Sequence, residues 1–115
     1  MKRFAVVIAL GFATSLTLGA HAAAAQTPDG ATIYRQHCRT CHGSTGTPAA
    51  RMVSLYPKLK TLSDSAFMAT LSVDSIVNVL KKGRGDMKPF ADKLSAAEMT
   101  AVAEYVRTLP SAHKP

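Results

Sequence analysis

Two cysteines and a histidine lie close together in the run Cys38-Arg39-Thr40-Cys41-His42. On a helical turn, thiols three positions apart lie on one face, where both can add to the two vinyl groups of a single porphyrin. The histidine that follows Cys41 can then place a ring nitrogen on the iron. The C-x-x-C-H spacing is typical of a covalently attached c-type haem.

Three other chemistries use a C-x-x-C pair. A structural zinc site needs four nitrogen or sulfur ligands, and beyond this motif the part after Ala25 offers only His37 and His113. A thioredoxin-type redox pair needs neighbouring strands, and no segment alternates convincingly between apolar and polar residues. A structural disulfide suits an oxidising compartment. Neither the disulfide nor the redox pair accounts for the adjacent His42.

A histidine-ligated haem iron has a second axial position, which a thioether can fill. Met68 and Met99 fall in amphipathic helical patterns and are expected to pack in the core, whereas Met52 sits in a predicted loop and remains open as a ligand. Met87 lies in the run Gly83-Arg84-Gly85-Asp86-Met87-Lys88-Pro89-Phe90. Its glycines let the backbone approach a ring closely and its proline stiffens the loop. We favour Met87, with gap-filling in the core as the other role for this side chain.

The N-terminus is typical of a secretory signal peptide: Met1-Lys2-Arg3 is followed by an apolar run and then by small residues through Ala25. We expect cleavage after Ala23 or, by preference, Ala25. The alternative is an uncleaved anchor, because the stretch 4–20 approaches the length of a membrane span. The sequence therefore predicts a signal peptide at 1–25 and one exported, periplasmic domain at 26–115, with no stable membrane insertion after cleavage.

The formal charge of +7 at pH 7 falls by two when Lys2 and Arg3 leave with the signal peptide. The remaining charges are scattered, which does not favour nucleic-acid binding, and a basic face that steers an acidic protein partner explains them better. A domain this short buries only a marginal apolar core. A covalently held haem would supplement that core.

The remaining pattern predicts helices joined by loops and no strand. The first helix begins near Asp29 and leads into the cysteine motif, and a loop follows from Gly43 to about Leu62. We expect a short helix capped by Ser63, a second capped by Asp74 and closed at Gly83, and a loop over 83–92. The last helix opens with the capping box Ser95-Ala96-Ala97-Glu98 and ends before Pro110. The fold class expected is all-α.

Together these motifs resemble a small, single-domain class I c-type cytochrome, of the bacterial periplasmic kind and similar to one half of the di-haem c4 type. The resemblance runs from about Asp29 to Leu109. It rests on Gly30 and Tyr34, on C-R-T-C-H-G, on P-K-L after a loop, on G-R-G-D-M-K-P-F, and on L-S-A-A-E followed by V-A-E-Y-V-R-T-L. Lys88 departs from the pattern, because many relatives have proline directly after the methionine.

The resemblance implies a cytochrome c fold of three to five helices wrapped around one covalent haem c and its iron. Cys38 and Cys41 would carry the thioether bonds, with His42 and Met87 as axial ligands. The carbonyl of Pro57 would accept the other ring N–H of His42. Gly30 and Tyr34 would cross the last helix near Tyr105 and Leu109.

Such a site, closed by His42 and Met87, predicts a one-electron carrier and not an enzyme, because no coordination position is open to a substrate. We expect redox partners such as a membrane oxidase, a reductase or a periplasmic dehydrogenase. Cations near the methionine would dock them, although any one of these residues could equally be plain solvated surface: Lys81, Lys82, Arg84, Lys88 and Lys93. If Met87 is labile, the alternative is a haem-based sensor, a small-ligand binder or a peroxidase-like protein; a permanent subunit of a larger redox complex is a third possibility.

Overall fold

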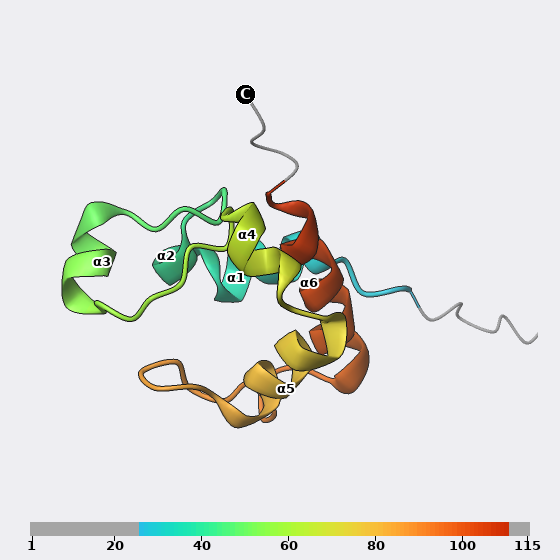
Figure 1. The fold of residues 1–115 in the computed structure, drawn as a ribbon. Coiled ribbons are helices and arrows are strands. Elements are labelled where there is room, and N and C mark those ends of the chain that lie inside the picture. The colour runs from blue at the N-terminus through green and yellow to red at the C-terminus, as the bar shows by residue number, and fades with distance from the viewer. Residues whose placement is uncertain (1–25, 111–115) are drawn as a thin grey trace, which may run out of the picture.

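The computed structural model describes residues 26–110, which form six helical segments (Figure 1). They are α1 (Gly30–His37), α2 (Arg39–His42), α3 (Ala50–Leu55), α4 (Ser65–Ala69), α5 (Val73–Lys82) and α6 (Ala96–Thr108). Within this range an isolated bridge between Arg84 and Met87 is the only β pairing. The all-α prediction is confirmed, whereas the predicted signal peptide at 1–25 lies outside the described residues.

The structure has more helical segments than the three to five expected. The attachment motif forms its own turn, α2, because the chain leaves regular geometry at Cys38, where φ is −116°. Segment α3 was expected to be loop. Its N-cap is Ala49, which makes no side-chain capping bond, so the start signal that sequence patterns provide is missing there.

Local capping explains where most helices begin. Asp29 accepts a hydrogen bond from the Ala31 N–H at the start of α1 (3.1 Å). The expected capping box of α6 is present, with Glu98 N donating to Ser95 Oγ (3.2 Å) and Ser95 N donating to Glu98 Oε2 (2.7 Å). These two helix starts confirm the prediction.

Two expected caps were wrong by one or two residues. Asp64, not Ser63, caps α4 by accepting from Ala66 N and Phe67 N, at 2.9 and 3.1 Å. Ser72, not Asp74, caps α5 by accepting from Ser75 N (3.0 Å). Asp74 lies in the first turn of α5 instead, where its charge still suits the positive end of the helix dipole.

The core lies where α1 crosses α6. Tyr34 is fully buried and its ring centre lies 5.4 Å from that of Tyr105, which confirms the expected crossing near Tyr105. The Tyr34 hydroxyl donates to the Gly43 carbonyl at 2.7 Å. A hydrogen bond from α1 to the residue after α2 therefore ties the attachment motif to the core. Helix α5 packs against the same α6.

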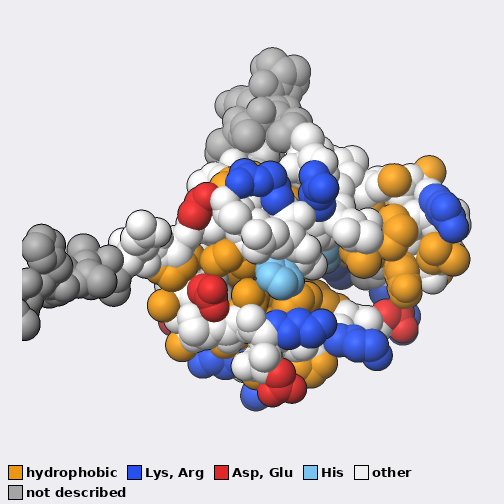
Figure 2. Space-filling view, turned by 180° about the vertical axis from the view of Figure 1, so that it is seen from behind, with side chains coloured by type: hydrophobic (Ala, Val, Ile, Leu, Met, Phe, Trp, Pro, Cys, Tyr) orange, Lys and Arg blue, Asp and Glu red, His pale blue; other side chains and the backbone are white. Residues whose placement is uncertain are grey.

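Segment α3 stands away from this core and carries the exposed large hydrophobic side chains. Val53 and Leu55 are 43% and 58% exposed, and Tyr56, which follows α3, is 37% exposed. Figure 2 shows hydrophobic side chains gathered at the α3 end of the molecule, with cationic side chains spread across the same face. No helix in residues 26–110 is long and apolar enough to span a membrane.

Candidate functional site

A cavity of about 570 Å³ lies between α2, the segment 56–62, α4, α5 and the turn at 84–87. Its walls are mainly apolar and include Leu62, Phe67, Met68, Leu71, Ile76, Val79, Leu80, Val102 and Val106. All five residues predicted to serve the cofactor also line it: Cys38, Cys41, His42, Pro57 and Met87. The fold thus brings together residues from segments that are far apart in the chain.

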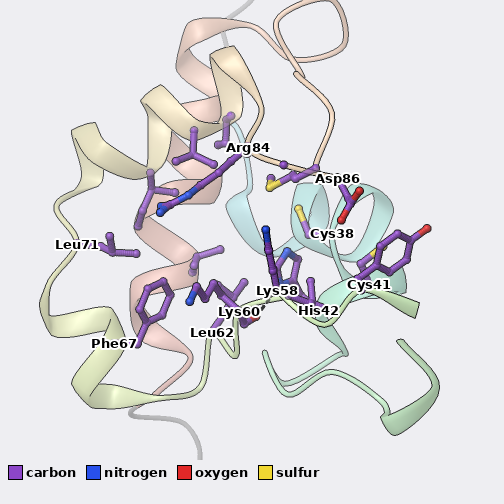
Figure 3. Close-up of a pocket in the computed structure, with 18 of the residues that line it drawn as sticks. Cys38, Cys41, His42, Lys58, Lys60, Leu62, Phe67, Leu71, Arg84 and Asp86 are labelled. Carbon is purple, nitrogen blue, oxygen red and sulfur yellow. Dashed lines mark hydrogen bonds between the residues drawn. The ribbon is translucent and has the colours of Figure 1, made fainter. Parts of the chain in front are cut away.

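The two cysteines approach the cavity from the start and the middle of the short turn α2 (Figure 3). Both are free thiols; Cys38 is buried and Cys41 half-buried. Burial raises the pKa of the Cys38 thiol to about 11, and the neighbouring Cys41 adds to the effect. Cys38 is therefore a neutral thiol at pH 7, seated in the wall of the cavity.

The ring of His42 is fixed by a backbone carbonyl, and that carbonyl is not the expected one. His42 Nδ1 lies 3.1 Å from the oxygen of Lys60, so the prediction that Pro57 accepts this bond was wrong. Leu59 N donates to the Tyr56 carbonyl at 2.9 Å. The resulting turn around Pro57 and Lys58 brings the carbonyl of Lys60 to the ring. Pro57 remains in the cavity wall beside it.

This contact prepares His42 to bind a metal. With Nδ1–H donating to the Lys60 carbonyl, the lone pair of the ring lies on Nε2. Burial lowers the pKa of His42, and the bond to Lys60 opposes that shift only in part. The imidazole is therefore neutral at pH 7, the state in which it acts as a ligand.

Of the four methionines considered, Met87 and Met68 line the cavity. Met68 and Met99 are each 4% exposed within the core, as expected for packing residues. Met52 lies on α3 and is absent from the cavity wall. Met87 is the methionine carried by a loop, and it is half-buried against the core.

A tight turn holds Met87 in place. Arg84 N donates to the Met87 carbonyl at 2.9 Å, and Met87 N donates to the Arg84 carbonyl at 3.0 Å. Gly85, inside the turn, has a φ of +57°, a conformation that side chains disfavour. Glycine at this position therefore permits the tight turn, and the turn delivers Met87 to the cavity from a different segment than the one that carries His42.

Charged groups are distributed unevenly around the cavity. Lys58, Lys60, Arg84 and Asp86 line it. In Figure 3, Lys58 and Asp86 are drawn on the side of the cysteines, whereas the Arg84 side chain points toward the side of Leu71. The other cations expected to dock partners, Lys81, Lys82, Lys88 and Lys93, are exposed and do not line the cavity.

The donors fit a covalent haem. Two thiols, a neutral imidazole with a free Nε2 and a thioether meet at one apolar cavity, and soft sulfur with imidazole is a ligand pair that haem iron accepts. Sequence reasoning missed the Lys60 carbonyl and the wall formed by Phe67, Leu71 and Val106. A backbone carbonyl that accepts a hydrogen bond cannot be recognised from residue type, because every residue has one. Apolar residues that line a cavity have the same sequence pattern as apolar residues packed in the core.

Comparisons with known proteins agree with this chemistry. Residues 25–106 match the family model described as cytochrome C oxidase, cbb3-type, subunit III. Over 80 residues the chain is 36% identical to cytochrome c6 of Microcystis aeruginosa. The aligned region covers 68% of this chain and 90% of that protein. Over 105 residues it is 35% identical to chloroplastic cytochrome c6 of Chlamydomonas reinhardtii, covering 85% of this chain and 66% of that one.

A solved structure is similar as well. The chain matches the KustC0563 c-type cytochrome with a TM-score of 0.63 and 33% sequence identity, over 70% of this chain and 96% of that one. The likeness therefore covers nearly the whole of that protein and most of the residues described here.

Proposed function

This chain belongs to the c-type cytochromes, within the family described as cytochrome C oxidase, cbb3-type, subunit III, and we propose that it carries single electrons with its haem iron held between His42 and Met87. The family binds covalent haem c, and its small relatives are electron carriers. The observation that supports the ligand assignment is the meeting of both cysteines, His42 and Met87 at one cavity.

When bound, haem supplies a couple between ferric and ferrous iron. The chain's own residues would hold that iron in a fixed environment. The Lys60 carbonyl sets the tautomer of His42, and the paired backbone bonds between Arg84 and Met87 fix the loop that carries the thioether. If His42 and Met87 both bind the iron, no coordination position would be left for a substrate. This arrangement favours transfer of an electron over a bond-making reaction.

The apolar wall adds to this effect. Phe67, Leu71 and Val106 give the cavity an apolar wall, and an apolar surrounding would disfavour extra charge on the iron. An apolar wall and a thioether ligand would both shift the equilibrium between ferric and ferrous iron toward the ferrous state.

The visible spectrum of the exported holoprotein tests the ligand assignment. We expect a low-spin ferric spectrum with the methionine–iron charge-transfer band and no response of the ferrous protein to carbon monoxide. In Met87→Ala the band should vanish and carbon monoxide should bind. Met52→Ala is the matched control, because Met52 lies outside the cavity wall, and should leave both properties unchanged.

Other outcomes would change the assignment. If Met87→Ala keeps the charge-transfer band, another methionine is the ligand and Met68 is the next to test. If the wild-type protein is high-spin or binds carbon monoxide readily, the site is open, and a sensor, ligand-binding or peroxidase-like function replaces electron transfer.

The proposed partners are acidic redox proteins, such as a membrane oxidase, a reductase or a periplasmic dehydrogenase. Lys81 and Lys82 close α5, and Lys88 lies just beyond the Met87 turn. These exposed cations border the segment that reaches the iron, so they are placed to steer an approaching carboxylate-rich surface. Arg84 shares that segment.

Charge reversal tests the docking surface. The triple variant K81E/K82E/K88E should lower the second-order rate of electron transfer to an acidic partner and remove its dependence on ionic strength. The triple variant R35E/R39E/R107E, with exposed sites on α1, α2 and α6, makes the same change in net charge and is the control. An equal effect of the control would show that net charge, not this surface, steers docking.

We further propose that residues 1–25 direct export to the periplasm and are then removed. The intact mass of the protein recovered from the periplasmic fraction tests this directly. A mass that begins at Gln26 supports cleavage after Ala25, a mass that begins at Ala24 supports the earlier site, and retention of the full chain in the membrane fraction would contradict the proposal.

A further inference from the structure

The charged side chains that line the cavity are not grouped in the same way at its two ends. On the side of the cysteines Figure 3 draws one cation and one carboxylate, Lys58 and Asp86. At the end bordered by Phe67 and Leu71, the side chains of Arg84 and Lys60 point inward (Figure 3). Lys60 Nζ lies 5.6 Å from the centre of the Phe67 ring, which places its charge at this far end.

These two cations are free to receive an anion. Among residues 26–110, neither Lys60 nor Arg84 forms an ion pair with a carboxylate. Both residues are exposed, but unlike Lys82 they border a cavity wall that is mainly apolar. A cation facing such a wall interacts more strongly with an anion than one in open water, because the local dielectric constant is lower.

Haem carries two anionic propionate groups, and their position relative to its vinyl groups is known. The vinyl groups of a porphyrin of the haem type are on one half of the macrocycle, and its two propionates are on the other half. Attachment through Cys38 and Cys41 fixes the vinyl half at one end of the cavity. The propionates must then lie toward the opposite end, which is the end that Lys60 and Arg84 face.

We propose that Lys60 and Arg84 bind the haem propionates, so that Lys60 serves the cofactor twice. Its backbone carbonyl orients the axial ligand His42, and its ammonium group holds a carboxylate of the same macrocycle. Arg84 acts likewise from the turn that carries Met87. Each axial ligand is thereby coupled to one charge contact at the propionate end. This inference rests on the proposed haem site and adds two positioning residues to it.

The side-chain role of Lys60 can be separated from its backbone role. Lys60→Met removes the charge and keeps the carbonyl that His42 requires, and Lys60→Arg restores the charge. Arg84→Gln removes the second cation and retains the backbone bonds to Met87. Lys82→Met is the matched control, because Lys82 is an exposed lysine on α5 outside the cavity wall.

The first readout is the propionate bending band in the resonance Raman spectrum of the ferrous holoprotein. We expect this band to shift in Lys60→Met and in Arg84→Gln, to shift further in the double variant, and to return toward its wild-type position in Lys60→Arg. It should not move in Lys82→Met. An unchanged band in the double variant would overturn the proposal.

The second readout is the midpoint potential as a function of ionic strength. Loss of either cation leaves a propionate uncompensated beside the iron, which favours the ferric state, so the potential should fall. The fall should be less sensitive to salt than any shift in Lys82→Met, because a direct contact with the propionate is screened less than a distant surface charge. Equal salt sensitivity of the Lys60 and Lys82 variants would also contradict the proposal.

Failure of the proposed propionate contacts can be distinguished from failure of the proposed function. If the wild-type protein lacks the low-spin spectrum with the methionine–iron band, the axial ligation is wrong whatever the propionates do. If that spectrum is present in wild type and all variants while the Raman band stays fixed, the ligation stands and the propionate contacts are wrong.

Discussion

Substitution of Gly30 by alanine tests the helix crossing on which the site is built. An added Cβ would lie 2.2 Å from the carbonyl oxygen of Ala101 and 2.9 Å from Cβ of Tyr105. The closer atom belongs to the backbone of α6 and cannot rotate away. The helices must therefore separate by about 1 Å, in a core packed as tightly as an organic crystal.

The two opposing effects have comparable size, and the clash should prevail. Alanine gains at most about 1 kcal/mol over glycine from helix propensity. Overpacking against a fixed neighbour costs about 1–3 kcal/mol, and a backbone contact this short belongs at the upper end. We expect a net loss of about 2 kcal/mol in the free energy of unfolding, which for a domain of this size lowers Tm by about 8–16 °C.

Thermal unfolding of the holoprotein, followed by circular dichroism at 222 nm, measures the effect. Gln36→Ala is the control, because Gln36 lies on the same helix and is exposed, and its Tm should stay within a few degrees of wild type or rise slightly. A Gly30→Ala protein as stable as wild type would refute the reasoning, because it would show that α1 and α6 do not approach as closely as described.

Three further perturbations follow from the contacts. Tyr34→Phe removes the hydroxyl that donates to the Gly43 carbonyl and should cost about 1–2 kcal/mol in denaturant unfolding; an unchanged midpoint would show that water replaces this bond without loss. Val102→Ala removes two methyl groups from a side chain that is 1% exposed and should cost about 2 kcal/mol, whereas Val53→Ala on the exposed α3 should cost far less. Glu98 has a pKa below its usual value, chiefly because it accepts from the Ser95 backbone N–H. Its contribution to stability is therefore present above the unfolded-state pKa of 4.5 and is lost as pH falls through the folded-state value. The stability of Glu98→Gln should fall less steeply than that of wild type between about pH 5 and pH 3, and parallel pH profiles would contradict the role of the capping box.

The residues that indicate haem attachment lie close together in the sequence. Cys38, Cys41 and His42 are neighbours, so their spacing alone indicates a covalently bound haem, and the comparisons show the family that binds it. The start of α6 is equally local, because Ser95 and Glu98 satisfy each other's backbone groups within one turn. Features made by residues a few positions apart need no tertiary contact to be recognised.

Helix starts that have no capping box were predicted less well. Ser63 and Asp64 are both good caps, and so are Ser72 and Asp74. The choice in each case depends on where the helix must point to bury its apolar side chains. Segment α3 shows the same limit, since it has no side-chain cap and no sequence signal to distinguish it from loop.

What only the tertiary structure decided is which distant groups meet. The sequence by itself determined the cofactor, the helical class of the fold and the small set of methionines that could complete the iron site. It could not determine that the Lys60 carbonyl, not that of Pro57, orients His42, because every residue has the same carbonyl and its direction depends on the turn that precedes it. Nor could it reveal that the side chains of Lys60 and Arg84 face the end of the cavity away from the cysteines (Figure 3). Backbone acceptors and the polarity of a cavity arise from the packing of segments far apart in the chain, and no local pattern of residues encodes them.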